Sequence, residues 1–127
     1  MTEVVLDASA LIAHARREAG HERVQDLLLK AVVSAVNLSE FVSRMVDLGY
    51  NEETIRRLLA ALPCRIATFD GSSALESGIL RGPTKHRGLS LGDRACLALA
   101  AKLGSPVLTA DGAWTELDLG IEVVLIR

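Results

Sequence analysis

Four carboxylates of this chain stand where an apolar run gives way to a helical pattern or where a helix begins. They are Asp7, Glu40, Asp93 and Asp111. Asp7 directly follows the short apolar run 4–6, which is typical of a buried parallel strand. Open α/β sheets bind their ligands at the carboxyl ends of the strands. If the strands are parallel, all four acids therefore lie at one edge of the sheet.

Each acid also has a purely structural explanation, because Asp, Asn and Ser are favoured helix N-caps. The segments 37–40 and 90–93 both resemble capping boxes, the second with Asp in place of the usual Glu or Gln. Asp7 and Asp111 fit as simple N-caps. Taken singly, each acid is more simply explained as a cap than as a ligand. Only their common position favours a functional site.

Carboxylates that converge on one pocket repel one another, and a divalent cation relieves that repulsion. Hard oxygen ligands select Mg²⁺ or Mn²⁺ over zinc. The reaction that suits such a site is phosphodiester hydrolysis, in which one metal activates a water and a second stabilises the leaving oxygen. Small polar residues beside the acids are expected to support them through hydrogen bonds. These supporting residues are Ser9, Asn37, Ser90 and Thr109.

The rest of the composition argues against other kinds of site. A net charge of −2 argues against binding of nucleic acid through an extended positive surface, but allows a local basic patch. Cys64 and Cys96 lack metal or redox spacing, which predicts two reduced core thiols in a cytosolic protein. No histidine has ligand spacing to another, and no Ser–His–Asp set, Walker loop or GxGxxG motif is present.

Apolar runs and helical patterns alternate along the chain, which predicts a parallel, three-layer α/β/α sheet in one domain, residues 1–127. The expected strands are 4–6, 31–36, 64–69, 106–109 and 121–126. The expected helices are 8–15, 21–29, 37–48, 51–62, 70–80, 90–103 and 111–117. The segment 81–88, rich in breakers and positive charge, is expected to be a loop that returns the chain across the sheet. With no signal peptide and no apolar run of membrane length, we expect a cytoplasmic protein without membrane association.

Four motifs in order give the chain a resemblance to PIN-domain ribonucleases, and most of all to the toxin of VapBC toxin–antitoxin pairs. The motifs are VLDASAL at 5–11, NLSE at 37–40, LSLGD at 89–93 and LTADGAW at 108–114. Each is weak alone, but four in this order and at these intervals are specific. The resemblance covers essentially the whole chain.

The resemblance implies a five-stranded parallel sheet of order 3-2-1-4-5, with the first and fourth strands meeting at the topological switch point. It assigns Asp7, Glu40, Asp93 and Asp111 to the acidic metal-binding positions of the catalytic centre, and Ser9 and Thr109 to its polar supporting positions. It further implies an endoribonuclease that uses Mg²⁺ or Mn²⁺, forms a homodimer and is silenced by a cognate antitoxin. No acidic position of the family is missing.

Contacts to RNA are open at this point. The basic residues of segment 81–88 either contact phosphates beside the pocket or belong to a solvated loop; they are Arg81, Lys85, His86 and Arg87. Arg44 stands four residues after Glu40, so it either pairs with that carboxylate or approaches the substrate. Trp114 either stacks on a base or packs the last helix into the core.

Three other interpretations compete. A receiver-like phosphoacceptor domain needs an acceptor Asp after the third strand, where Asp70 stands, and a lysine after the last strand, where there is none. A haloacid-dehalogenase-like phosphatase needs a second Asp where this chain has Ser9. A catalytically idle partner-binding domain has no need of four intact acids.

Overall fold

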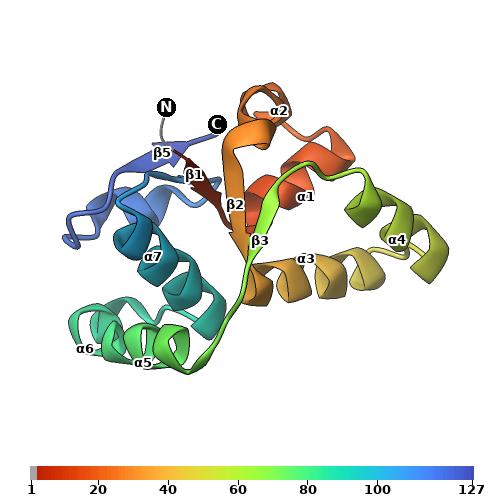
Figure 1. Cartoon of the computed structure of the whole chain (residues 1–127). Helices are drawn as coiled ribbons and strands as arrows, with labels where there is room; N and C mark the ends of the chain where they lie inside the picture. The colour runs from red at the N-terminus through yellow and green to blue at the C-terminus, as the bar shows by residue number, and fades with distance from the viewer. Residues whose placement is uncertain (1–2) are drawn as a thin grey trace.

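The structure, a computed structural model, describes residues 3–127. Met1 and Thr2, which belong to the domain predicted over 1–127, lie outside the described residues. Five parallel strands form one sheet in the order β3-β2-β1-β4-β5 (Figure 1). The strands are β1 (Val4–Leu6), β2 (Ala31–Ser34), β3 (Arg65–Ala67), β4 (Val107–Thr109) and β5 (Val123–Leu125). The predicted fold class and strand order are confirmed.

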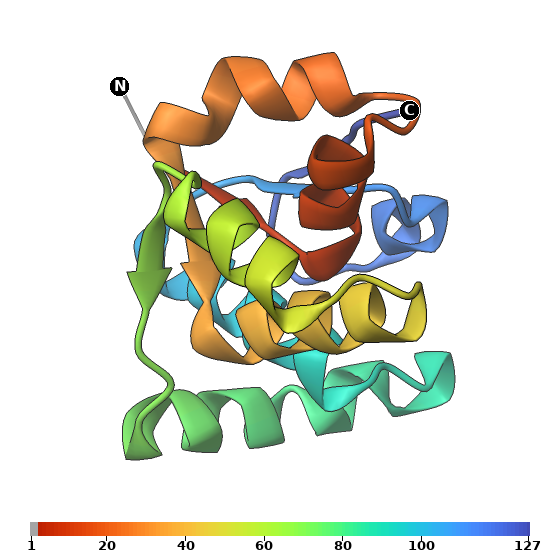
Figure 2. The ribbon, with the colours of Figure 1, turned by 90° about the vertical axis from the view of Figure 1, so that its right-hand side faces the viewer.

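Helices cover both faces of the sheet (Figures 1 and 2). They are α1 (Ala8–Arg16), α2 (His21–Leu27), α3 (Ala35–Asp47), α4 (Glu52–Ala60), α5 (Gly71–Ile79), α6 (Arg81–Thr84) and α7 (Leu91–Leu103). Residues 3–127 also contain three short 3₁₀ helices, which are η1 (Leu28–Lys30), η2 (Lys85–Arg87) and η3 (Gly112–Glu116). Within residues 3–127, no helix is both long and apolar enough to pass through a membrane.

The alternation of side chains along β1 divides the core into two layers, because successive strand residues point to opposite faces. Val4 and Leu6 pack with buried residues of α1 to α4, such as Phe41. Val5 packs on the other face with Cys96 and other residues of α7 and η3. All three β1 residues are buried, as expected for a central parallel strand.

The start of α3 differs from the prediction of a strand over 31–36 and a helix from residue 37. Strand β2 ends at Ser34, whose hydroxyl accepts a hydrogen bond from the Val36 backbone N–H (3.2 Å) and caps α3. Ala35 and Val36 continue the apolar run, but they lie in the first turn of the helix. An apolar run by itself cannot mark this boundary, since buried strands and buried helix turns share it. Asn37 is therefore inside α3, and not at its N-cap.

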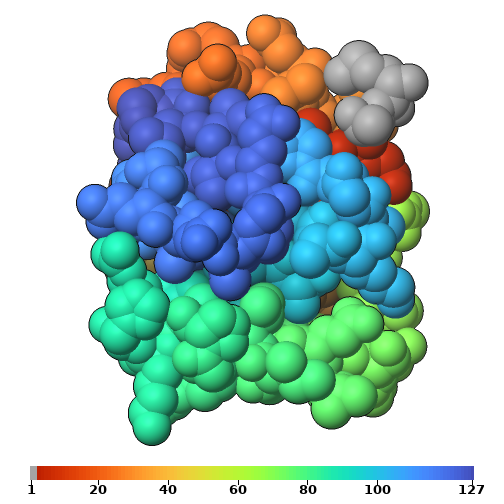
Figure 3. Space-filling view, turned by 90° about the vertical axis from the view of Figure 1, so that its left-hand side faces the viewer, coloured from red at the N-terminus to blue at the C-terminus, as the bar shows by residue number. Residues whose placement is uncertain are grey.

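Segment 81–88 also differs from the predicted loop, because it folds into α6 and η2. Pro83 is tolerated because the first-turn N–H groups of a helix have no intrahelical partner. The segment does return the chain from α5 to α7, as expected, and α5 packs along α7. The space-filling view of the side that lies at the left of Figure 1 shows α5 and α6 directly below α7 and the C-terminal segment (Figure 3).

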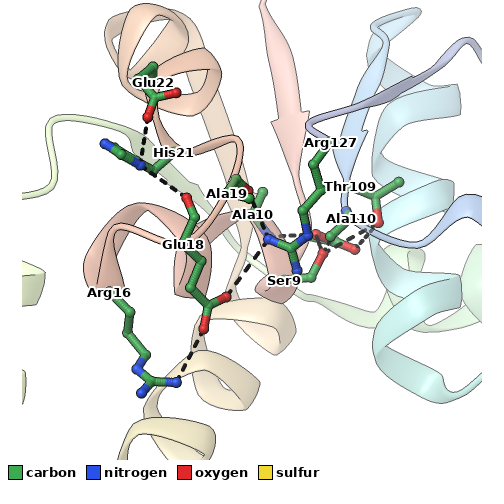
Figure 4. A network of polar contacts seen from close by, with 11 residues as sticks. Ser9, Ala10, Arg16, Glu18, Ala19, His21, Glu22, Thr109, Ala110 and Arg127 are labelled. Carbon is green, nitrogen blue, oxygen red and sulfur yellow. Dashed lines mark hydrogen bonds and ion pairs between the residues drawn. The ribbon is translucent and has the colours of Figure 1, made fainter.

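The C-terminal end is fastened to the connection between α1 and α2 (Figure 4). Arg127 donates a hydrogen bond from Nη1 to the Ala19 carbonyl (2.9 Å) and faces the Glu18 carboxylate at 3.9 Å. Gly20 has a φ of +92°, and a Cβ placed there would lie 2.2 Å from the Ile126 carbonyl oxygen. A residue with a side chain would thus be strained and would push the C-terminal segment away.

Candidate active site

Asp7 stands between β1 and α1 and is 7% exposed. Its Oδ1 accepts hydrogen bonds from the Ser9 hydroxyl (2.6 Å) and the Ala10 backbone N–H (3.0 Å). Its Oδ2 accepts one from the hydroxyl of Thr109 (2.5 Å), at the end of the neighbouring strand β4. Asp7 is thus both the N-cap of α1 and a buried carboxylate at the carboxyl end of the central strands.

The hydroxyl groups of Ser9 and Thr109 connect the Asp7 carboxylate to the chain that leaves β4. Figure 4 shows Ser9 and Thr109 beside Ala110. Ser9 Oγ accepts a hydrogen bond from the Ala110 backbone N–H (2.9 Å), and Thr109 Oγ1 accepts one from the Asp111 backbone N–H (3.0 Å). Each hydroxyl donates its single proton to Asp7 and accepts from the segment after β4. Ser9 and Thr109 therefore hold Asp7 and the Asp111 backbone in register.

Glu40 lies in α3 and contacts the first turn of α7. Its Oε1 accepts a hydrogen bond from Asn37 Nδ2 (2.9 Å), and the same amide nitrogen donates to the Gly92 carbonyl (3.0 Å). Asn37 is 1% exposed. A Cβ built on Gly92 would lie 2.1–2.2 Å from three atoms of the Glu40 carboxyl group. The sequence prediction of Glu40 and Asn37 overlooked Gly92, whose one signal is a glycine in the first turn of a helix.

Ser90 and Asp93 form the predicted capping box at the start of α7. Ser90 Oγ accepts a hydrogen bond from the Asp93 backbone N–H (3.1 Å), and Asp93 Oδ2 accepts one from the Ser90 backbone N–H (3.0 Å). The capping box proposed for 37–40 is wrong, because α3 begins at Ala35 and Asn37 bonds to the Glu40 side chain.

Asp111 is the N-cap of η3, where its Oδ1 accepts a hydrogen bond from the Ala113 backbone N–H (3.0 Å). It is exposed, and its charge is not among those that shift the pKa of Asp7 or of Glu40. Over residues 3–127, no group of three or more His, Cys, Asp or Glu side chains is gathered tightly enough to hold a metal ion. Three acids therefore interact electrostatically, while Asp111 joins them through Thr109.

The electrostatics of the site come mainly from burial. Burial raises the pKa of Asp7, its three hydrogen bonds oppose this shift, and the Asp93 charge raises the pKa further. Burial also raises the pKa of Glu40, the Asn37 hydrogen bond lowers it, and the charges of Asp93 and Asp7 raise it. Burial and the same three acids hold the pKa of the Cys96 thiol well above its usual value, so Cys96 is the neutral core thiol that was predicted.

The donor set suits a hard divalent cation, since carboxylate oxygens are the ligands that Mg²⁺ and Mn²⁺ prefer. Among the hydrogen bonds of residues 3–127, Asp7 Oδ2 accepts one and Asp93 Oδ1 and Glu40 Oε2 accept none. These oxygens keep lone pairs available for a ligand. A cation that drew the three acids together would relieve their mutual repulsion.

The family model of the PIN domain matches residues 4–119 of the chain. The chain belongs to the PIN domain family. No curated protein matches the sequence. Among solved structures, this PIN domain is similar to VapBC2 of Rickettsia felis bound to promoter DNA, with 16% identity, 98% of both chains covered and a TM-score of 0.76. It is also similar to a toxin–antitoxin complex of Klebsiella pneumoniae, with 20% identity, 98% of both chains covered and a TM-score of 0.74.

A third similar structure is VapC20 of Mycobacterium tuberculosis, described as a toxin that cleaves the sarcin–ricin loop. It shares 13% identity with this PIN domain, covers 94% of this chain and 99% of its own, and has a TM-score of 0.71. At these identities the three structures establish the shared fold.

Arg44 lines an open groove of about 640 Å³ beside Glu40 on α3 of the PIN domain. Among the ion pairs of residues 3–127, none involves Arg44, so the predicted alternative of a pair with Glu40 is wrong. Arg81, Lys85 and His86 are exposed on α6 and η2. Arg87 pairs with Glu116 of η3 at 3.0 Å, which ties the segment to the helix that Asp111 caps.

Trp114 does not offer its ring to a ligand, because it is 1% exposed. It packs with Cys96, Leu97 and Val5 on the α7 face of the PIN-domain sheet. The alternative in which Trp114 packs the last helix into the core is confirmed, and the one in which it stacks on a base is wrong.

Proposed function

We propose that this PIN domain is a metal-dependent endoribonuclease and the toxin of a type II toxin–antitoxin pair. The observation that carries the proposal is the geometry at the carboxyl ends of β1 and β4. There the buried Asp7 carboxylate is held by Ser9 and Thr109. The Glu40 carboxylate lies against the first turn of α7, which contains Asp93. Membership of the PIN family and similarity to toxin–antitoxin complexes support the proposal. So does the similarity to VapC20, a toxin described as cleaving the sarcin–ricin loop.

In this proposal Mg²⁺ or Mn²⁺ would draw the carboxylates of Asp7, Glu40 and Asp93 together, with Asp111 completing the set. When bound, the cation supplies Lewis acidity for hydrolysis of an RNA phosphodiester bond. The chain's own polar residues orient the acids. Ser9 and Thr109 fix both oxygens of Asp7. Asn37 fixes Glu40, and Ser90 fixes the backbone at Asp93.

RNA would approach along the α3 groove, where Arg44, which forms no ion pair among residues 3–127, would meet a phosphate beside Glu40. Arg81, Lys85 and Arg87 extend positive charge on the α6–η2 side, although the pair with Glu116 already engages Arg87. The partners proposed for this chain are a cognate antitoxin protein and a second copy of itself. The toxin–antitoxin complexes among the similar structures support the antitoxin.

The deciding experiment is cleavage of total RNA by the purified protein in EDTA, Mg²⁺ or Mn²⁺, with wild type beside Asp7→Asn. The matched control is Asp70→Asn, because Asp70 is also an N-cap but is exposed and caps α5 through Ser73 (3.0 Å). We expect metal-dependent cleavage by wild type and Asp70→Asn, and none by Asp7→Asn. Cleavage that persists in EDTA, or in Asp7→Asn, would contradict the proposal.

The receiver-like alternative is tested by the same control variant. A phosphoacceptor role would require Asp70, so Asp70→Asn would abolish labelling by a small phosphodonor such as acetyl phosphate. We expect no such labelling in wild type. A protein that cleaves no RNA with either metal and takes up no phosphate would instead match the idle partner-binding domain.

A further inference from the structure

We propose that Gly92 is a positioning residue, because the missing side chain leaves the space in which the Glu40 carboxylate sits. The inference deepens the proposed function, since its consequence for cleavage rests on Glu40 acting at the site. The seat itself exists in the metal-free protein, where it is tested without any assumption about activity. We call the Gly92 backbone together with the Asn37 amide the Glu40 seat.

The floor of the Glu40 seat is the first turn of α7. The nearest heavy atoms to a Cβ built on Gly92 are Oε2, Cδ and Oε1 of Glu40, at 2.1, 2.2 and 2.2 Å. Real Cβ atoms essentially never come within 3.0 Å of another group. The Glu40 carboxyl group therefore occupies the volume that any other residue at position 92 would fill with its own side chain.

The wall of the Glu40 seat is the Asn37 amide. Its Nδ2 donates to both Glu40 Oε1 and the Gly92 carbonyl, at 2.9 and 3.0 Å, so one side chain fastens α3 to α7 and aligns the carboxylate. Asn37 is 1% exposed, and its Oδ1 is buried with no hydrogen-bond partner among the described residues. An orphaned buried carbonyl is costly. The Asn37 Oδ1 is left without a partner because the NH₂ group must face both Glu40 Oε1 and the Gly92 carbonyl.

Backbone conformation does not explain a glycine at this position. Gly92 is the second residue of α7 and lacks the positive φ that Gly49, Gly88 and Gly104 have. A glycine within a helix is less favourable than an alanine. Gly78 provides the comparison, since it is also helical, yet a Cβ there would meet nothing within 4 Å. Close approach of the Glu40 carboxylate is the remaining reason.

Gly92→Ala should consequently move a carboxylate without unfolding the protein. The atoms in its way are the far end of a flexible side chain, which can rotate, and alanine favours the helix. Gly78→Ala adds the same methyl group to a helix with open space. The pair of variants separates displacement of Glu40 from any general effect of alanine.

The first test is the NMR signal of the Asn37 side-chain NH₂ in ¹⁵N-labelled, metal-free protein. We expect this signal to shift in Gly92→Ala, because the hydrogen bond to Glu40 is lost or lengthened, and to stay in place in Gly78→Ala. Glu40→Gln should also shift it. An Asn37 signal unchanged in Gly92→Ala, in a variant shown to be folded, would overturn the Glu40 seat.

The second test is cleavage kinetics in a double-variant cycle. We expect Gly92→Ala to lower kcat by about 10- to 100-fold, as loss of a positioning contact at a metal site typically does. KM for RNA should change less than threefold, and Gly78→Ala should match wild type. Asp at position 40 is one methylene shorter, so adding Gly92→Ala to Glu40→Asp should cost less than threefold more.

The results distinguish failure of the Glu40 seat from failure of the proposed function. Equal losses from Gly92→Ala in the Glu40 and Glu40→Asp backgrounds would overturn the steric explanation even if wild type cleaves RNA. A wild-type protein without cleavage would overturn the proposed function and the catalytic consequence. The NMR comparison would still decide whether Gly92 and Asn37 position Glu40.

Discussion

Asp7 serves two purposes at the residue scale, because the carboxylate that caps α1 is also the most buried acid of the site. At Asp7 burial raises the pKa, and three donors only partly compensate for it. The exposed cap Asp70 shows the opposite behaviour, because the hydrogen bond from the Ser73 backbone N–H lowers its pKa. The folded protein therefore carries an electrostatic cost at Asp7 that a cap alone does not require.

The raised pKa values of the site predict how the stability of the metal-free protein depends on pH. The pKa values of Asp7 and Glu40 are raised above their usual 3.8 and 4.5, so the folded state binds these protons more tightly than the unfolded chain. Their stabilising contribution is complete below those usual values and is lost as pH rises through the folded pKa values. Stability of wild type relative to Asp7→Asn should therefore fall as pH rises from about 4 toward 7.

Urea unfolding of both proteins in EDTA across this range measures the difference. The comparison cancels His14, whose pKa burial lowers and which therefore removes stability as pH falls below its usual 6.5. Asn keeps the acceptor for the Ala10 N–H, so the cap survives in the variant. A stability difference that does not vary with pH would contradict the raised pKa values.

Helix α7 shows at the element scale how a cap can serve a site. The Ser90–Asp93 capping box fixes the turn that also contains Gly92, so helix start and acid placement depend on the same hydrogen bonds. Ser90→Ala should lower the free energy of unfolding by about 1 kcal/mol. It should also lower cleavage, because the first turn of α7 loosens.

Asn51→Ala is the matched control, since Asn51 caps α4 through the Thr54 N–H (2.9 Å). It should cost a similar unfolding free energy but leave RNA cleavage intact. Denaturant unfolding and cleavage rates, measured on both variants, give the comparison. Equal activity in the two variants would show that the α7 cap is only structural.

The α3 groove predicts the role of Arg44. If Arg44 contacts a phosphate of the RNA as proposed, it contributes to substrate binding, so Arg44→Ala should raise KM for RNA with kcat nearly unchanged. It should also reduce the salt dependence of binding by about one unit in the log–log slope. Arg56→Ala is the control, because Arg56 is exposed on α4 and, within residues 3–127, pairs only with Glu52. An unchanged KM in Arg44→Ala would exclude Arg44 from RNA binding.

The sheet determines at the scale of the whole molecule which acids meet. Strand order places β4 beside β1, so Thr109 reaches Asp7 across 102 residues of sequence. Packing of α3 on α7 then brings Glu40 against Gly92. The proposed cation would bridge these elements and bind the folded state alone, so it should stabilise the entire domain.

Melting in rising Mg²⁺ concentrations tests this linkage. At a free Mg²⁺ concentration 100 times the Kd, the stabilisation is about 2.7 kcal/mol. Wild type and Asp70→Asn should gain this stability alike, and Asp7→Asn should gain little. Equal gains by all three proteins would mean that Mg²⁺ acts elsewhere on the surface.

Much of the architecture was predictable from the sequence, because its signals are local. The apolar run of β1 and the alternation of strands with helices predicted the parallel sheet and the edge at which Asp7 stands. The strand order came from the family resemblance that four short motifs carry. The capping box of Ser90 and Asp93 was visible because all of its atoms belong to four consecutive residues.

Tertiary structure alone decided what depends on distant partners. The Glu40 seat joins Asn37 to Gly92 across 55 residues, and no local pattern reports that α3 and α7 meet there. Burial of Trp114 likewise follows from packing. The start of α3 at Ser34 could not be predicted because β2 and the first turn of α3 share one apolar run. Local hydrogen bonding can be inferred from neighbours in sequence, whereas the position of a carboxylate depends on which elements the fold packs together.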